Sequence, residues 1–585
     1  MVRREPGDDR ALCEAGVHPL LARSYAARGV SDPAQLDLDL TRLLPPERLL
    51  NADIAAVRLA QALAQQQSIL LVGDFDADGA TSCALAVRAL RAFGAARVDY
   101  LVPNRFDYGY GLSPEIVALA RERSPDLIIT VDNGISSIDG VAAAMAAGID
   151  VVVTDHHLPG EAMPAAGIIV NPNQPGCDFP SKHLAGVGVI FYVMLALRRH
   201  LRETGWFERQ GVAVPHLGQF LDLVALGTVA DVVALDHNNR ILVQAGLQRI
   251  RAGRGCVGIR ALLAVAGRNA AALVAADLGF AVGPRLNAAG RLDDMSVGIE
   301  CLLSDEESVA LDYARQLDQF NRDRRLIERG MQDEALRLLA GTRIDPADAP
   351  AALALYDPGW HQGVVGILAS RIRERVHRPV VAFADAGDGE LKGSARSIPG
   401  VHIRDVLATI DARHPGLLHK FGGHAMAAGL SLSADGLDEF ASALALEVQR
   451  VATAADLEAV LHSDGSLAPE EFDLALAEEL RAAGPWGQQF PEPLFDGRFE
   501  VVSQRLVGER HLKLVLRLPG RNELVDAIAF NIDPAVWPDD QVQSLTLVYR
   551  LDANEFRGQR SLQLIVEHLE HDTENAAFTQ GGSLR

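Results

Sequence analysis

Three carboxylates follow one buried strand in residues 68–82, which read SILLVGDFDADGATS. Asp74, Asp76 and Asp78 repel one another by about 1 kcal/mol per pair in water and by more near a protein interior, so a cation is expected among them. The spacing matches the start of an EF-hand calcium loop. However, the twelfth loop position, which should be a bidentate Glu, is Leu85, and a strand instead of a helix precedes the loop. A calcium loop is excluded on these two grounds.

Two further predicted strands end in the same way. DLIITV (126–131) runs into Asp132, and DVVVT (150–154) runs into Asp155, His156 and His157. In open parallel sheets, ligands bind beyond the carboxyl ends of the strands, so these clusters are expected to converge. A lone Asp after a strand is more often a helix N-cap, and the repetition at three strand ends is what favours a metal site. Asp231, which ends the apolar segment LDLVALGTVAD, is a fourth candidate.

The charge of these acids predicts two cations instead of one. Six acids carry about six negative charges, of which two divalent ions would offset about four. Carboxylates mixed with one or two imidazoles suit Mn²⁺ or Mg²⁺, and the lack of thiolates argues against structural zinc. Paired ions activate water and clamp the oxygens of a phosphoester. The predicted chemistry is phosphoester hydrolysis with Mn²⁺ or Mg²⁺, and the six acids are Asp74, Asp76, Asp78, Asp132, Asp155 and Asp231.

The chain as a whole is predicted to contain four structured parts. After a helical lead-in (1–50), apolar strands alternate with Ala-rich helices over 51–305, which predicts an α/β unit with a mostly parallel sheet. A Pro-free stretch at 306–342 predicts one connecting helix of about 50 Å, followed by a second, smaller α/β unit at 343–455. Five alternating strands in 456–570 predict an OB-type barrel, with a sandwich fragment as the alternative. The tail at 571–585 is expected to be disordered.

Composition narrows the class of protein. No apolar run approaches the roughly 20 residues of a membrane helix, so we expect no membrane partner and a cytoplasmic location. Five cysteines without a CxxC pair support neither a disulfide framework nor a zinc ribbon. The net charge of −22 argues against a general nucleic-acid coat protein. It does not exclude an enzyme that acts on nucleic acid, because bound metals and a local arginine-lined groove can reverse the sign.

Taken together, the motifs resemble those of the DHH phosphoesterase superfamily, which is named for the triplet at 155–157. The resemblance covers about residues 40–570 and is strongest to the branch of single-strand-specific 5′-to-3′ DNA exonucleases. It implies a DHH catalytic domain, a connecting helix, a DHH-associated domain and an OB fold that binds nucleic acid. The motifs are GDFDADGATS (73–82), VPNRFDYGYGLSP (102–114), TVDNGIS (130–136), TDHH (154–157), GTVADVV (227–233), GPRLNAAGRL (283–292) and GGHAMAAG (422–429).

The resemblance also implies roles for single residues. The metals would be held by Asp76, Asp78, Asp132, His156 and Asp231, with Asp74 and Asp155 as ligands or close neighbours. His157 would face the scissile phosphate, so the implied catalytic set is Asp76, Asp78, Asp132, His156 and His157. Ser394 and Arg396, in a segment similar to the family's phosphate-gripping turn, would hold the 5′-terminal phosphate. The implied substrate-binding residues are Asn104, Arg105, His157, Arg285, Asn287, Arg291, Ser394, Arg396, Gly422, Gly423 and His424.

The function implied is a metal-dependent exonuclease that degrades single-stranded DNA from its 5′ end in DNA repair and recombination. A single-strand-binding protein and a helicase are further expected partners. One alternative is a DHH phosphodiesterase of short oligonucleotides or cyclic dinucleotides, whose relatives lack the barrel. Another is a non-catalytic DNA-binding scaffold, which would gain stability by losing the clustered acids. The chain departs from the family at Gln489 and Phe490, which replace Gly-Asn in a turn before the barrel.

Overall fold

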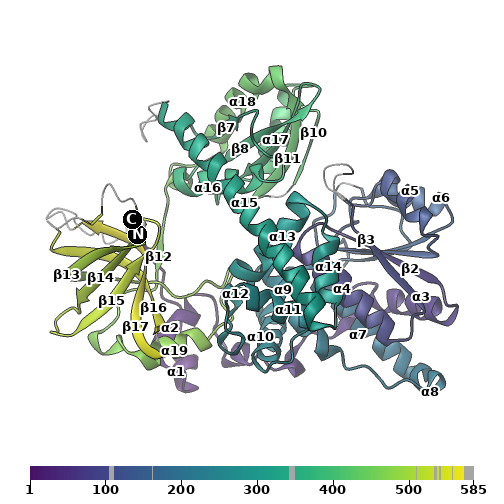
Figure 1. Ribbon diagram of the computed structural model, residues 1–585, viewed down its shortest axis with the longest axis horizontal. Coiled ribbons are helices and arrows are strands. Elements are labelled where there is room, and N and C mark those ends of the chain that lie inside the picture. Colours follow the sequence, from purple (N-terminus) through teal and green to yellow (C-terminus); the bar gives the residue numbers. More distant parts are fainter. Residues whose placement is uncertain are drawn as a thin grey trace.

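The computed structural model describes residues 1–103, 108, 111–160, 162–341, 350–423, 425–508, 510–532, 537–538, 542–556 and 558–571. A first α/β unit and a closed barrel lie side by side, and one long helix rises from the first unit to a second α/β unit above it (Figure 1). This arrangement confirms the predicted fold class. None of the described helices is both long and apolar enough to cross a membrane.

The first unit is built on five parallel strands in the order β3-β2-β4-β5-β6. Because side chains alternate along a strand, Leu71 and Ile129 pack into one core and Leu70 and Ile128 into another. Helices α3, α4 and α7 contribute to the first core and α5 and α6 to the second, so the sheet is covered on both faces. The bounds are β2 (Ser68–Gly73), β3 (Arg97–Leu101), β4 (Leu127–Val131), β5 (Asp150–Thr154), β6 (Ile168–Val170), α3 (Ala52–Ala64), α4 (Ala77–Ala92), α5 (Pro114–Glu122), α6 (Ile138–Ala146) and α7 (Gly186–Glu203).

A helical layer completes the first unit. Its members are α8 (Trp206–Gln210), α9 (Leu221–Ala230), α10 (His237–Arg251), α11 (Val257–Val265), α12 (Ala275–Asp277), α13 (Gly283–Leu292) and α14 (Ser296–Leu303). Helix α15 (Glu307–Gly341) then leaves the unit as one element of 35 residues. At 1.5 Å per residue it spans about 50 Å, as predicted.

The second unit has a mixed sheet in the order β10-β11-β9-β8-β7. One face packs on α17 and α18 through a core that includes Phe383, Leu430 and Phe440. The other face packs on α16 and α15 over β7, β8 and part of β9, through Ala382, Leu368 and neighbouring residues. The bounds are β7 (Leu353–Tyr356), α16 (Val365–Val376), β8 (Val380–Gly387), β9 (Glu390–Arg396), α17 (Ile403–Arg413), β10 (Lys420–Gly423), β11 (Ala427–Ser433) and α18 (Leu437–Val451).

The barrel is a closed ring in the order β13-β14-β15-β17-β16, as expected for the OB type, which rules out the sandwich fragment. Its strands are β13 (Phe495–Val507), β14 (His511–Arg517), β15 (Leu524–Ala529), β16 (Ser544–Phe556) and β17 (Gln559–His571), preceded by α19 (Leu474–Ala482). The predicted tail at 571–585 lies almost wholly outside the described residues. The exact domain boundaries stay a prediction.

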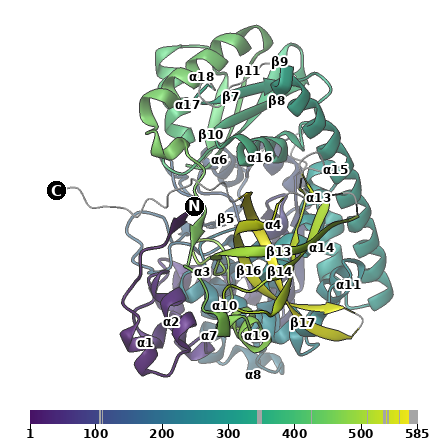
Figure 2. The same ribbon diagram turned by 90° about the vertical axis from the view of Figure 1, so that its left-hand side faces the viewer.

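The N-terminal lead-in packs beside the barrel in Figure 2. It contains α1 (Arg10–Glu14) and α2 (Pro19–Ala26). Its first strand, β1 (Val2–Arg3), pairs in parallel with β12 (His462–Ser463), at the start of the segment that leads to the barrel. The Arg28 guanidinium lies 2.6 Å from the Asp464 carboxylate, and both side chains are 1% exposed. The lead-in is therefore tied to the segment that precedes the barrel by a buried ion pair.

Candidate metal centre

The ends of β2, β4 and β5 lie level, because their last residues are partners in the parallel register. Asp74, Asp132 and Asp155 are the next residues, so they emerge side by side from one edge of the sheet. The Asp132 amide donates to the Thr154 carbonyl at 3.1 Å, which ties two of these strand ends together. The three predicted clusters therefore meet in space.

The side chains at this edge form three overlapping triplets, in each of which the possible ligand atoms lie within 4.8 Å of one another. Asp132 and His156 each belong to two triplets. His156 Nε2 lies 3.1 Å from Asp132 Oδ1 and 3.4 Å from Asp231 Oδ2. Carboxylate oxygens with an imidazole nitrogen are donors that fit Mn²⁺ or Mg²⁺. The triplets are Asp74, Asp76 and Asp132; Asp132, His156 and His157; and Asp78, His156 and Asp231.

Three of these carboxyl groups have strongly raised pKa values. Burial, followed by the charge of Asp76, raises the pKa of Asp78 to about 7. Burial and the surrounding carboxylates also hold the pKa values of Asp132 and Asp231 well above the usual range. Each anion is therefore disfavoured unless an opposite charge lies close by. The raised pKa values of these carboxyl groups therefore indicate a site that binds cations.

Backbone donors fix two of the acids. Asp76 caps α4, where it accepts from the amides of Asp78 at 2.9 Å and Gly79 at 3.0 Å. Asp78 accepts from the amides of Gly186 at 2.6 Å and Val187 at 2.9 Å, at the start of α7. The N-cap role that a lone strand-end Asp usually has is thus present at Asp76. Asp76 can cap the helix and also belong to one of the triplets, because a carboxylate has about four acceptor sites.

Asp155 differs from its neighbours because internal donors occupy it. It accepts from the amides of His156 at 2.7 Å, His157 at 3.1 Å and Ile135 at 2.9 Å, and it lies 2.7 Å from His157 Nδ1. Burial alone would raise the pKa of Asp155, but these imidazoles and donors lower it to about 2. Burial likewise opposes a charged His157, yet Asp155 raises the pKa of that imidazole to about 9. Asp155 belongs to none of the three triplets, and its geometry is that of a residue that orients His157.

Two asparagines that the sequence analysis did not single out support the histidines. Asn173 Nδ2 donates to the His156 carbonyl at 2.6 Å, and Asn171 Nδ2 donates to the His157 carbonyl at 2.9 Å. Both follow β6, which is the next strand of the sheet after β5. The signal for them was present in the sequence, since GIIV at 167–170 is another apolar strand that ends in polar residues at the same edge.

Two backbone outliers flank the site. Asp132 has φ of +62° and Val232, directly after Asp231, has φ of +61°. Asp tolerates this left-handed region, whereas a β-branched residue is rare there. Such strain persists only where the surrounding structure enforces it, and it is common at functional sites.

Three predicted substrate residues have internal partners. Asn287 Oδ1 accepts from the Ala77 amide at 2.7 Å, so α13 holds the loop between β2 and α4. Arg291 donates to the Gly363 carbonyl at 3.1 Å, which links α13 to the second unit just before α16. Arg285 is buried and donates to Asp318 of α15 at 2.9 Å. These contacts give the side chains bracing roles, and their contacts with DNA stay predictions.

Ser394 and Arg396 lie together on β9. Arg396 Nη1 donates to Ser394 Oγ at 3.0 Å. A Cβ added to Gly366, in the first turn of α16, would lie 2.9 Å from an atom of each side chain. Amides at a helix N-terminus, a hydroxyl and a guanidinium are donors that suit a phosphate.

The remaining predicted substrate residues are placed only in part. Gly422 and Gly423 lie on β10, at the edge of the same sheet. Asn104, Arg105 and His424 lie outside the described residues.

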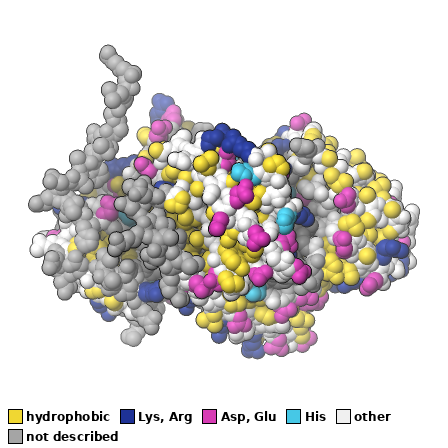
Figure 3. All heavy atoms as spheres, turned by 90° about the horizontal axis from the view of Figure 1, so that it is seen from above, with side chains coloured by type: hydrophobic (Ala, Val, Ile, Leu, Met, Phe, Trp, Pro, Cys, Tyr) yellow, Lys and Arg dark blue, Asp and Glu magenta, His cyan; other side chains and the backbone are white. Residues whose placement is uncertain are grey.

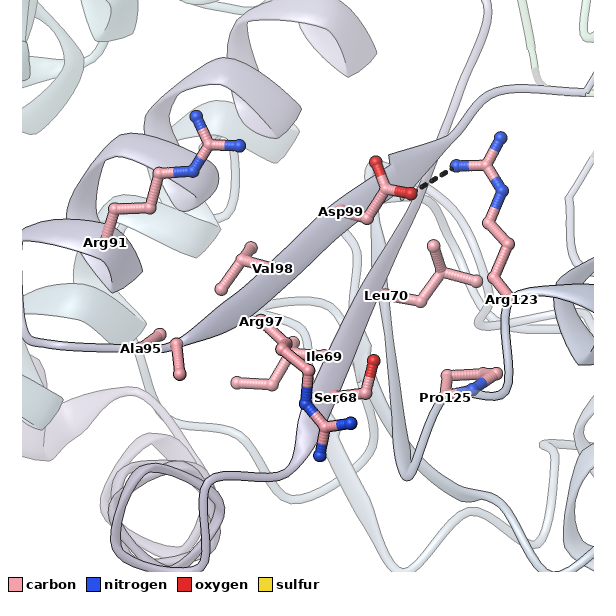
Figure 4. A pocket seen from close by; sticks show the side chains of 11 residues that line it. Ser68, Ile69, Leu70, Arg91, Ala95, Arg97, Val98, Asp99, Arg123 and Pro125 are labelled. Carbon is pink, nitrogen blue, oxygen red and sulfur yellow. Dashed lines mark hydrogen bonds and ion pairs between the residues drawn. The ribbon is translucent and has the colours of Figure 1, made fainter.

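A hollow of about 280 Å³ lies at the opposite, amino-terminal edge of the first sheet (Figure 4). It is lined in part by Arg97 and Arg123. Arg123 donates to Asp99 at 2.8 Å and Arg97 donates to the Gln66 carbonyl at 2.9 Å. Because these guanidiniums have acceptors and ligands gather at the other edge of a parallel sheet, we do not assign this hollow to the reaction.

Comparison with known proteins agrees with this geometry. Residues 68–228 match the model of the DHH family N-terminal domain, 349–450 the DHHA1 domain and 463–568 the RecJ OB domain. The single-stranded-DNA-specific exonuclease RecJ of Dickeya dadantii is 59% identical over 569 residues, which cover 97% of this chain and 98% of that protein. The chain belongs to the RecJ family.

Solved structures of the RecJ family share the fold. A crystal structure of RecJ from Thermus thermophilus in complex with Mn²⁺ matches with a TM-score of 0.79 and 31% identity, covering 98% of this chain and 79% of that chain. A second structure of that protein, in complex with Mg²⁺, matches with a TM-score of 0.74 and 29% identity, covering 98% and 78%. The order of the three units is therefore that of the RecJ fold.

Proposed function

We propose that this chain is a metal-dependent exonuclease that hydrolyses single-stranded DNA from its 5′ end. The observation that carries the proposal is the set of three overlapping triplets at the strand ends, which share Asp132 and His156. Two closely spaced ions require ligands that both ions can contact. Membership of the RecJ family, whose members are named as exonucleases specific for single-stranded DNA, supports the substrate class.

Two divalent cations, Mn²⁺ or Mg²⁺, would be held by Asp74, Asp76, Asp78, Asp132, His156 and Asp231. When bound, such ions activate water and stabilise the charge of the phosphate as it is attacked. The chain's own residues position this chemistry. Asp132 would contribute to both ions, while the backbone donors around Asp76 and Asp78 fix the directions of those carboxylates.

His157 would contact the phosphate that is cleaved. Asp155 accepts from its Nδ1, fixing the ring orientation and favouring the charged imidazolium. An imidazolium can donate a hydrogen bond to an anionic phosphate oxygen. Asp155 would thus act on the substrate only through His157.

The preference for a 5′ end would come from Ser394, Arg396 and the first turn of α16. A terminal phosphate has more negative charge than an internucleotide phosphate and suits this group of donors. Because Arg291 links the residues before α16 to α13, and α13 holds the metal loop, this pocket has a fixed connection to the reacting centre.

The barrel would hold the strand downstream of the cut, as OB folds do with single-stranded nucleic acid. It favours a long substrate over short oligonucleotides or cyclic dinucleotides. A single-strand-binding protein and a helicase as partners, a role in repair and recombination, and a cytoplasmic location belong to this proposal.

The deciding experiment uses end-labelled single-stranded and duplex DNA with Mn²⁺, Mg²⁺ or a chelator. We expect labelled mononucleotides from the 5′ end of single strands only, and none after metal removal. Asp132→Ala should lower turnover by on the order of 10³-fold, because several kcal/mol of transition-state stabilisation are lost. Binding of single-stranded DNA should persist in that variant. Unimpaired cleavage by Asp132→Ala, or by metal-free protein, would refute the proposal.

A further inference from the structure

Phe280 has the largest exposed fraction of any large apolar residue that the structure describes, at 78%. The one other exposed aromatic residue in the described ranges is Phe530, which is 50% exposed and contacts the His511 ring at 5.1 Å. Phe280 contacts no aromatic ring of the described residues. A single exposed apolar side chain is common on protein surfaces, so its surroundings decide whether it has a function.

Phe280 projects from a π-helical turn. The helix that begins as α12 and continues as α13 widens into the π-helix η6 at Leu278–Val282. Leu278, Ala281 and Val282 of this turn are buried, whereas Phe280 points outward. Such turns are rare, and they occur frequently at functional sites.

The π-helical turn packs on the end of α9, which leads into Asp231. A Cβ added to Gly279 would lie 3.2 Å from Val229 Cγ1, and a Cβ added to Gly283 would lie 3.1 Å from Ala230 Cβ. Asp231 is the next residue after this contact and belongs to one of the three triplets. The turn that carries the exposed ring is therefore mounted beside a predicted metal ligand.

The same segment reaches towards the barrel at its other end. Arg481 of α19 donates to the Ala272 carbonyl at 3.0 Å, and its Nη1 lies 3.9 Å from Asp552 of β16. Helix α12 begins soon after Ala272 and lies on the side of the first unit that faces the barrel (Figure 1). At the end of the segment, Asn287 holds the loop between β2 and α4. Residues 272–287 therefore connect the edge of the barrel with the metal centre, and Phe280 stands between the two.

The upper surface of the second unit is less suited to a nucleic-acid strand. When the molecule is seen from above, acidic side chains are spread over its central part (Figure 3). The exposed acids on this side include Asp405 of α17 and Asp438 and Glu439 of α18. Carboxylates repel phosphates, so the strand is expected to run below the second unit, where the first unit and the barrel lie.

We propose that Phe280 stacks on a base of the retained strand, on the 3′ side of the cut. This inference rests on the proposed function and deepens it, because it assigns a residue that positions the strand between the metal centre and the barrel. Every base has an aromatic face, so stacking on a ring holds a strand without reading its sequence. The contact therefore suits an enzyme that moves along a strand of any sequence.

The test combines variants of Phe280 with substrates that lack one base. Phe280→Ala removes the ring and Phe280→Trp keeps one. Met145→Ala is the matched control, because Met145 is 51% exposed at the end of α6 that leads to the amino-terminal edge of the sheet. Phe280 is exposed, so its variants should fold, and unchanged unfolding midpoints will verify this.

The substrates are 5′-labelled oligonucleotides, either intact or with one abasic site at successive positions from the 5′ end. Release of the first labelled nucleotide is followed in single-turnover reactions over a range of enzyme concentrations. The half-saturating concentration reports binding of the strand, and the maximal rate reports the cut.

We expect Phe280→Ala to raise the half-saturating concentration on the intact strand about tenfold, with the maximal rate nearly unchanged. Phe280→Trp and the control should match the wild type. In the wild type, an abasic site at one position close to the 3′ side of the cut should cause a similar loss. Phe280→Ala should show no additional loss at that position, because the stacking contact is already missing.

The inference is overturned if Phe280→Ala binds the intact strand as well as the wild type does, or if the two proteins show equal abasic penalties at every position. Failure of the wild-type protein to cut any single strand would instead refute the proposed function.

Discussion

At the scale of single residues, two aspartates in equivalent positions have opposite properties. Asp132 and Asp155 each follow the last residue of a buried strand, on neighbouring strands of one sheet. Burial and nearby carboxylates raise the pKa of Asp132, whereas imidazoles and amides lower the pKa of Asp155 to about 2. The position at a strand end therefore brings a carboxylate to the site, and the donors around it decide what the carboxylate does.

The asparagines behind the histidines offer a test at this scale. Asn173→Ala removes the donor to the His156 carbonyl. We expect activity or apparent Mn²⁺ affinity to fall by roughly 10- to 100-fold, as is typical when support for a metal-binding residue is lost. The measurement is turnover as a function of Mn²⁺ concentration. Asn269→Ala, an exposed cap in the same unit, is the control and should retain both values.

The residue types at the site were predictable from the sequence, but the role of each residue was not. The acids and imidazoles could be found because each cluster ends an apolar run of four to six residues. Asn287 holds the metal loop through a hydrogen bond to a residue 210 positions away in the chain, and the amide of Ile135 that helps to hold Asp155 is 20 positions away. Such contacts leave no local pattern in the sequence.

At the scale of elements, the turn at residues 488–490, before the barrel, attaches this segment to the first unit. We call this turn the anchor. Gln489 adopts φ of +58° at a position where the family usually has Gly, and Phe490 is almost fully buried. The Phe490 ring stacks on Trp486 at 5.2 Å and lies 4.2 Å from the Arg240 guanidinium of the first unit. The Gln488 carbonyl accepts from the amide of Leu235, four residues after Asp231. The departure from the family pattern thus builds a contact that supports the segment behind a predicted metal ligand.

Removing this anchor should destabilise the protein. Phe490→Ala is expected to lower the free energy of unfolding by about 3 kcal/mol, because truncating a buried aromatic leaves a cavity. Chemical denaturation monitored by tryptophan fluorescence measures the change. Phe530→Ala is the control, since that ring is 50% exposed and its loss should change stability by less than about 0.5 kcal/mol. Equal stability of the two variants would contradict the anchoring role.

Elements were predictable where burial produced a simple pattern. The apolar runs of β2, β4 and β5, and the alternating strands of the barrel, appear in the structure as expected. Strands β3 and β9–β11 could not be predicted, because charged residues and glycines interrupt their patterns. Helix α4 begins at Ala77, inside the acidic motif, because Asp76 caps it. A cap and a metal-ligand pattern use the same residue type, so sequence alone could not locate this boundary.

At the scale of the whole molecule, the lead-in, the barrel and the first unit pack together. The lead-in adds a strand next to β12 and buries Arg28 against Asp464. Tyr25 of α2 stacks on Trp486 at 5.6 Å, beside the anchor that reaches the first unit. The second unit is joined to this assembly by α15 and by the contact between Arg291 and Gly363. The proposed substrate path therefore lies between an assembly that packs together, made of the lead-in, the barrel and the first unit, and a second unit that is joined to it by α15 and the Arg291 contact.

The buried ion pair should couple stability to the handling of long substrates. Arg28→Met removes the hydrogen-bonded cation from the buried Asp464 and leaves it the more distant Arg4, whose Nε lies 3.9 Å away, so we expect a loss of about 3 kcal/mol. The KM should rise more for long single strands that reach the barrel than for very short ones. Steady-state kinetics on two oligonucleotide lengths will show this difference.

Replacing both partners, as Arg28→Met with Asp464→Leu, should recover part of the stability, because the buried carboxylate is removed together with its main partner. If the single variant is as stable as wild type, the pair does not hold the lead-in to the barrel.

The crowding of carboxylates at the strand ends also has a thermodynamic consequence for folding. An unfolded chain separates these acids, whereas the native sheet forces them together, so divalent ions bind the native state far more tightly than the unfolded one. Ligands of that kind shift the folding equilibrium by mass action. The resistance of this protein to heat should therefore follow the free concentration of Mn²⁺ or Mg²⁺, and the cell's supply of these ions would set the amount of folded enzyme as well as its rate.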